Sequence, residues 1–102
     1  MIRHIVLIRF RPDVTEPAIT ALFAELAAIQ RQLPGCLAIA SGRSASPEAL
    51  ERGHMHGFTI DFASWDALAA YQVHPDHQAL GAKLVGHAAG GLDGILVFDL
   101  AI

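Results

Sequence analysis

The first apolar run of the chain, Ile2 to Phe10, is rich in β-branched residues and apolar at nearly every position. A strand covered on both faces reads this way. Residues two apart share a face, and one face carries His4, Val6, Ile8 and Phe10. The other carries Ile5 and Leu7. The turn residues Arg11-Pro12-Asp13 end the strand, and Asp13 or Thr15 can cap a following helix.

Apolar residues then recur at helical spacing as far as about Leu33, and Pro34-Gly35 ends this helix. Its predicted buried face consists of Ile19, Leu22, Phe23, Leu26, Ile29 and Leu33. A second strand is predicted from about Cys36 to Arg43, and a polar loop from Ser44 to Gly53 follows it. The third predicted strand runs from His54 to Phe62. Its alternation places five residues on one face: His54, His56, Phe58, Ile60 and Phe62.

Ser64 is a good cap for a helix that contains Trp65, Leu68 and Tyr71. Pro75 disfavours helical geometry at the residue before it, so this helix should stop near His74. Proline also suits the first turn of a helix, which predicts a second helix from Pro75. A final strand is predicted from Leu92 to Leu100.

The predicted order is β-α-β-β-α-β with the second helix broken, which is typical of a ferredoxin-like α+β fold. Helices would cover one face of the sheet and leave the other bare. The hydrophobic fraction of 53% is high for 102 residues. Two bare sheets packed together would account for this excess, so we expect a homodimer.

Length and charge limit the function classes. At 102 residues the chain is expected to form a single domain over positions 1–102. The net charge is −3 and the basic residues are scattered, which does not favour nucleic acid. Cys36 is the lone cysteine, so no internal disulfide is expected. The sequence shows no targeting segment or membrane helix, and we expect a cytoplasmic protein without membrane partners.

Four polar side chains are expected to meet beneath the helices. His77 shares a helix face with Leu80 and Leu84, so it should point inward. Tyr71 lies near the end of the preceding helix, and His4 and His56 lie on the stronger apolar face of their strands. A neutral imidazole can accept a proton near pH 7, and a tyrosine hydroxyl can donate to a developing enolate oxygen. Taken singly, each residue could also be an ordinary core or capping group.

A metal site is the alternative to this pocket. His54-x-His56 on a strand and His74-x-x-His77 are possible ligand pairs. The second pair spans the helix break, and no carboxylate falls at a convincing third position. Asp76 more simply stabilises the start of its helix. The sequence therefore favours a pocket without metal or cofactor.

Three segments resemble the stress-responsive A/B barrel domain, the Dabb family. They are Ile2-Arg3-His4-Ile5-Val6-Leu7-Ile8-Arg9-Phe10, Tyr71-Gln72-Val73-His74-Pro75-Asp76-His77 and Gly94-Ile95-Leu96-Val97-Phe98-Asp99. The resemblance covers nearly the whole chain and implies a ferredoxin-like monomer that forms a dimeric α+β barrel. The family includes stress proteins, members without an established reaction, and a polyketide cyclase.

Similarity to that cyclase implies roles for four residues. His77 would be the base that removes a proton beside a carbonyl of a linear poly-β-keto thioester. Tyr71 would align the substrate, and His4 and His56 would shape the pocket. Intramolecular aldol closure needs no cofactor. Three functions stay open: a dimeric binding or stress protein with a small apolar or polyketide-like ligand, a cyclase, and a metal- or haem-handling barrel protein.

Overall fold

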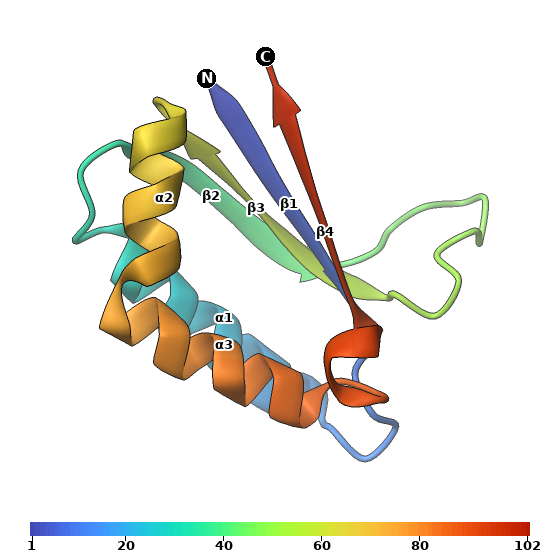
Figure 1. Cartoon of the computed structure of the whole chain (residues 1–102). Coiled ribbons are helices and arrows are strands. Elements are labelled where there is room, and N and C mark those ends of the chain that lie inside the picture. Colours follow the sequence, from blue (N-terminus) through green and yellow to red (C-terminus); the bar gives the residue numbers. More distant parts are fainter.

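A computed structural model describes all residues from Met1 to Ile102. Its elements are β1 (Ile2–Ile8), α1 (Glu16–Gln30), β2 (Cys36–Arg43), β3 (His56–Phe62), α2 (Trp65–Val73), α3 (Pro75–His87), a 3-10 turn (Gly91–Gly94) and β4 (Ile95–Ala101). The four antiparallel strands form one sheet in the order β2-β3-β1-β4, and all three helices lie against one face (Figure 1). The predicted ferredoxin-like β-α-β-β-α-β arrangement is confirmed.

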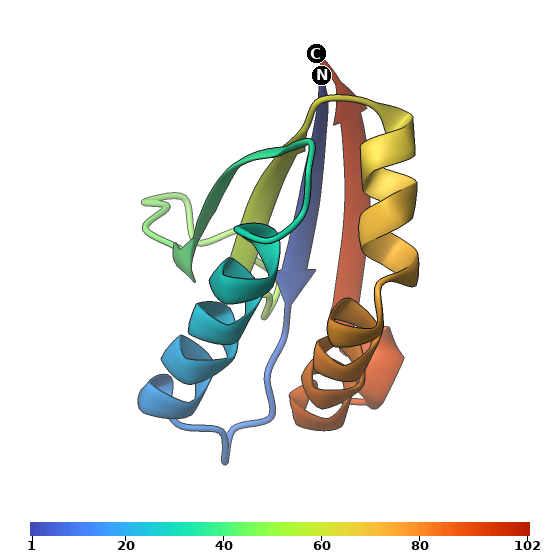
Figure 2. The same cartoon turned by 90° about the vertical axis from the view of Figure 1, so that its left-hand side faces the viewer.

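The strand register determines which side chains face the helices. Residues directly opposite each other in an antiparallel pair lie on the same face of the sheet. His4 is opposite Ile60 on β3 and Asp99 on β4, and Ile8 is opposite His56. The predicted alternation of β1 and β3 is therefore correct, and both histidines face the helices. α1 covers one side of this face, and α2 with α3 covers the other (Figure 2).

The core between helices and sheet is built from the predicted apolar stripes. Thr15 caps α1 by accepting a hydrogen bond from the amide of Ala18, at 3.3 Å. The buried apolar residues of α1 are Ile19, Leu22, Phe23, Leu26 and Ile29. They pack with Phe58, Ile60 and Phe62 of β3, each at most 4% exposed.

The break between α2 and α3 has two separate causes. His74 has extended backbone angles (φ −66°, ψ 132°), and Pro75 has no amide hydrogen to continue α2. α3 then begins at Pro75, as predicted, and His74 Nδ1 accepts a hydrogen bond from the amide of Asp76 at 3.1 Å. At the start of α2, Ser64 Oγ accepts from the amide of Ala67 at 3.2 Å. The break places the end of α2 next to the first turn of α3.

Three predicted boundaries differ from the structure. β1 ends at Ile8, and Phe10 makes only an isolated bridge to Ala88. β3 begins at His56, so His54 lies in the preceding loop. β4 begins at Ile95, because a 3-10 turn occupies Gly91–Gly94. Local turns satisfy the backbone at each of these ends, and alternation of side chains cannot reveal them.

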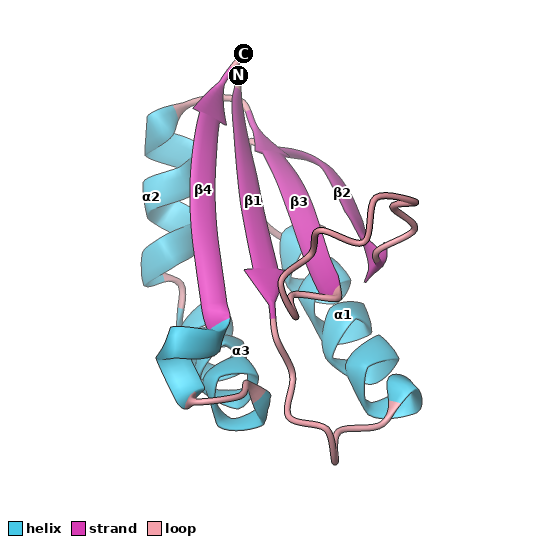
Figure 3. Ribbon diagram, turned by 90° about the vertical axis from the view of Figure 1, so that its right-hand side faces the viewer, coloured by secondary structure: helices cyan, strands magenta, loops and turns pink.

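The second face of the sheet is not covered by any helix (Figure 3). It carries large apolar side chains that are far from buried: Leu7, Leu96, Phe98 and Leu100. The loop between β2 and β3 stands off this face (Figures 1 and 3). This face is termed the open face below. Among the helices, none combines the length and apolar character that crossing a membrane requires.

Candidate functional site

Tyr71, His77 and His4 form a cluster between the sheet and the helix break. The ring centroids of Tyr71 and His77 are 4.0 Å apart, and those of His4 and Tyr71 are 5.9 Å apart. The tyrosine is fully buried and His4 is 5% exposed, whereas His77 is half-buried. The three residues come from the last turn of α2, the first turn of α3 and the middle of β1. The sequence correctly predicted that these three side chains meet.

Asp99 is a fourth member that sequence reasoning missed. Its Oδ1 lies 2.6 Å from Nδ1 of His4, and its side chain is 26% exposed. The signal was present, because Asp99 is the one charged residue in the apolar run Ile95–Ala101. Only the register between β1 and β4 places it directly opposite His4. With the carboxylate accepting from Nδ1–H, Nε2 of His4 would be free to accept a hydrogen bond.

Two buried polar atoms at the centre of this cluster have no hydrogen-bond partner in the chain. They are the hydroxyl oxygen of Tyr71 and Nδ1 of His77. Leaving a buried donor or acceptor unpaired costs roughly 1–3 kcal/mol per group. Buried polar atoms in folded proteins nearly always have partners, so two adjacent exceptions need an explanation. A bound molecule with a donor and an acceptor would satisfy both.

Burial determines the protonation of these two side chains. It raises the pKa of Tyr71 far above its usual value, and the nearby Cys36 adds to the effect, so the phenol stays protonated at neutral pH. Burial also lowers the pKa of His77 below 6.5; His4 and His74 act in the same direction, and the backbone at Gln72 opposes them. At neutral pH the cluster therefore offers a neutral imidazole beside a protonated phenol.

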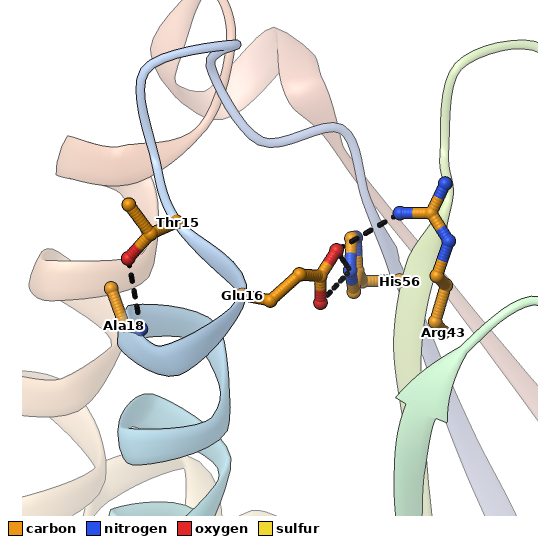
Figure 4. Close-up of polar contacts among 5 residues, drawn as sticks. All are labelled: Thr15, Glu16, Ala18, Arg43 and His56. Carbon is orange, nitrogen blue, oxygen red and sulfur yellow. Dashed lines mark hydrogen bonds and ion pairs between the residues drawn. The ribbon is translucent and has the colours of Figure 1, made fainter.

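His56 does not join this cluster. It is opposite Ile8, four residues along β3 from the partner of His4, which corresponds to roughly 13 Å. Its Nε2 instead lies 2.9 and 3.0 Å from the two carboxylate oxygens of Glu16 at the start of α1. Arg43 donates to the same carboxylate at 2.9 Å (Figure 4). The expectation that all four groups share one spot is thus wrong for His56, because facing the helices does not fix position along the strand.

The expected open pocket beneath the helices is not seen. Of the four most developed hollows on the molecule, none is lined by Tyr71 or His77. Aromatic rings fill the space instead: Phe62 lies 5.1 Å from Tyr71, and Phe58 lies 6.4 Å from His4, between ring centroids. The cluster is closest to solvent through Asp99 at the β4 edge.

The two candidate metal pairs are also separated by the fold. His54 is in a loop and His56 is paired with Glu16, while Nδ1 of His74 is used to cap α3. No group of three or more histidine, cysteine or acidic side chains comes together in the way a metal site requires. The polar chemistry of the helix-covered face therefore lies in two separate groups, Tyr71–His77–His4–Asp99 and His56–Glu16–Arg43.

The fold and its broken second helix define a ferredoxin-like α+β protein with a single helical layer. The family model of the stress responsive A/B barrel domain, Dabb, matches residues 2–102. The chain belongs to this family.

Known relatives agree over nearly the full length. The stress-response A/B barrel domain-containing protein HS1 of Arabidopsis thaliana is 30% identical over 98 residues, which cover 96% of this chain and 86% of that protein. A crystal structure of a dimeric ferredoxin-like protein of unknown function from Jannaschia superposes with a TM-score of 0.92 at 33% identity, covering 99% of this chain and 98% of the other. Olivetolic acid cyclase of Cannabis sativa is 21% identical over 80 residues, 78% of this chain and 79% of the enzyme.

Proposed function

We propose that this protein is a homodimer that binds a small carbonyl-containing molecule at Tyr71 and His77. The observation that carries the proposal is the pair of adjacent buried atoms without partners, Tyr71 Oη and His77 Nδ1. A ligand carbonyl could accept from the phenol, and an acidic C–H or O–H of the same molecule could approach the imidazole. The dimeric relative from Jannaschia supports the assembly.

Access to the cluster requires a local rearrangement, because Tyr71 is fully buried. The edge of β4 is the nearest route. Asp99 is partly exposed there, and Val97, two residues earlier on the same face, is 55% exposed. A ligand entering beside this edge meets His4 first and then Tyr71. An apolar tail would suit the aromatic surroundings provided by Phe58 and Phe62.

Ligand binding can be tested by NMR with 2,4-pentanedione, a small β-diketone, as the probe. The ring proton resonances of His77 and His4 should shift on titration, whereas that of His54 should not. Tyr71→Phe should weaken the effect, since it removes the donor. Titration to millimolar probe without a selective shift at His77 would overturn the binding proposal.

A second candidate function is an intramolecular aldol closure. The favouring observation is the neutral His77 imidazole next to a protonated phenol, both away from bulk water. His77 would take a proton from the carbon between two carbonyls, and the resulting enolate carbon would form a C–C bond to a distal carbonyl of the same chain. Tyr71 would donate to the oxygen that becomes an alkoxide, and the protonated His77 would return the proton to it. Olivetolic acid cyclase is a relative whose name denotes cyclisation.

The test of this chemistry is turnover of a 3,5-dioxo thioester, measured by mass spectrometry of the cyclised product. His77→Ala should abolish product formation, because no other side chain in the cluster replaces the base. His54→Gln serves as a matched histidine control and should leave the rate unchanged. A rate in His77→Ala equal to that of the unaltered protein would exclude His77 as the base.

A further inference from the structure

The open face of the sheet has an ordered distribution of large and small side chains. Three rows of residues cross it from β4 through β1 and β3 to β2, as given by the strand register. The rows are Leu100, Arg3, Asp61 and Ala38; Phe98, Ile5, Thr59 and Ala40; and Leu96, Leu7, Gly57 and Gly42. In each row the residues on β4 and β1 are large, and the residue on β2 is glycine or alanine. The face is therefore high along one side and low along the other.

This face needs a partner of its own size. Phe98, Leu96 and Leu100 are 54%, 46% and 44% exposed. Four strands of about seven residues present roughly 19 × 24 Å, or about 450 Å² in projection, before side-chain relief and the β2–β3 loop are counted. A stable interface buries about 800 Å² on each partner. A second copy of the chain fits this requirement, and homodimerisation is part of the function proposed above.

Two symmetry axes would bring two open faces together, and the rows distinguish them. An axis parallel to the strands turns each row back upon itself, so that Phe98 lies over the partner subunit's Ala40 and Leu96 over the partner subunit's Gly42. An axis across the strands instead puts Leu100 over the partner subunit's Leu96, and small residue over small. Interiors tolerate neither overlap nor void, so the first axis is favoured.

The charged row gives an independent reason for the same axis. Arg3 donates to both carboxylate oxygens of Asp61 at 2.8 and 3.1 Å, and this contact holds the pKa of Asp61 below its usual value. With the axis along the strands, each Arg3 also lies over the partner subunit's Asp61, and the four charges alternate in sign. With the other axis, Arg3 lies over the partner subunit's Leu7 and is buried without a second carboxylate.

A hollow of about 490 Å³ marks where the largest mismatch in height would be filled. It is lined by Gly42, Gly57 and Leu7 from the sheet and by Leu50 from the β2–β3 loop. A Cβ placed on Gly42 would meet nothing within 4 Å, so the floor of the hollow is free. We infer that two copies dock by their open faces about a two-fold axis parallel to the strands, with Leu96 of the partner subunit seated in this hollow.

Matched substitutions on β4 test which face forms the contact. Phe98→Arg should raise the dimer dissociation constant at least about 100-fold, because the substitution removes a buried ring from both copies. Val97→Arg is the control: Val97 is equally exposed, at 55%, but points to the helix side. Sedimentation across protein concentrations should show a monomer for the first and a dimer for the second. Dissociation by Val97→Arg alone would overturn the proposal.

The axis is tested by cross-linking with a short bis-maleimide on a Cys36→Ser background. Phe98→Cys together with Ala40→Cys should give a cross-linked dimer, joined between positions 98 and 40 in peptide mass spectra. Facing sheets lie about 10 Å apart, whereas the two positions are roughly 14 Å apart within one chain. Phe98→Cys alone should cross-link poorly.

Efficient cross-linking of the Phe98→Cys single variant, joining position 98 of one copy to position 98 of the other, would overturn the axis and leave the dimer intact. A chain that stays monomeric would remove both this inference and the homodimeric part of the proposed function. The NMR titration with 2,4-pentanedione is independent of these results, because Tyr71 and His77 come from the same chain and face the sheet's helix-covered side.

Discussion

Removing the hydroxyl of Tyr71 should stabilise the unliganded protein, which is the reverse of the usual result for a buried tyrosine. The hydroxyl has no hydrogen-bond partner, so burial costs it roughly 1–3 kcal/mol. The oxygen returns only a few dispersion contacts of about 0.1–0.2 kcal/mol each, roughly 0.5–1 kcal/mol together. Tyr71→Phe should therefore increase the free energy of unfolding by about 1 kcal/mol.

The assay is urea denaturation followed by circular dichroism at one fixed protein concentration. With a typical dependence of about 1–3 kcal/mol per molar urea, the midpoint should rise by roughly 0.5 M. Ser64→Ala is the control, because its hydroxyl does have a partner, the amide of Ala67. That variant should lose about 1 kcal/mol. A Tyr71→Phe protein destabilised by as much as Ser64→Ala would show that the phenol is satisfied, and the argument for a ligand there would fail.

Three further predictions concern pH, packing and the second polar group. Because the folded state lowers the pKa of His77, stability should be complete above about pH 6.5 and fall as the pH drops below it; His77→Gln should flatten this slope in urea midpoints measured from about pH 7.5 to 5. Gly35→Ala should destabilise by about 1 kcal/mol or more, since φ is +82° and the new Cβ would lie 2.6 Å from that of Ala67; an unchanged melting temperature would contradict this. Glu16→Gln should lower the urea midpoint at about pH 7, because it removes the carboxylate that contacts His56, and the difference should shrink as the pH falls below 4.5; a difference constant over that range would contradict an ion pair.

The sequence predicted the fold in detail where hydrophobic periodicity was strong. The alternation of β1 and β3 and the stripe of α1 are as expected, and Pro75 correctly separated α2 from α3. Each of these depends on local rules, either the period of a strand or helix or the missing amide of proline. The start of β4 was misplaced, because Leu92 in the 3-10 turn appears in the sequence as part of the apolar run that follows it.

The candidate site was predictable only in part, because it depends on distances that alternation does not contain. Facing the helices was correct for His4 and His56, yet only His4 lies next to Tyr71. Asp99 was missed because its importance comes from strand pairing with β1, which joins positions 95 residues apart. The filled state of the core could not be read from the sequence either, since packing of Phe58 and Phe62 depends on the tertiary arrangement.

The interruption at His74 and Pro75 has a mechanical consequence for Tyr71 and His77. The two rings belong to different rigid rods, and no continuous ladder of backbone hydrogen bonds fixes the angle between the rods. A small tilt of α3 relative to α2 would widen the 4.0 Å separation of the rings without melting a turn of either helix. The joint thus works as an elbow, and a guest molecule could be admitted by bending it rather than by unfolding the protein.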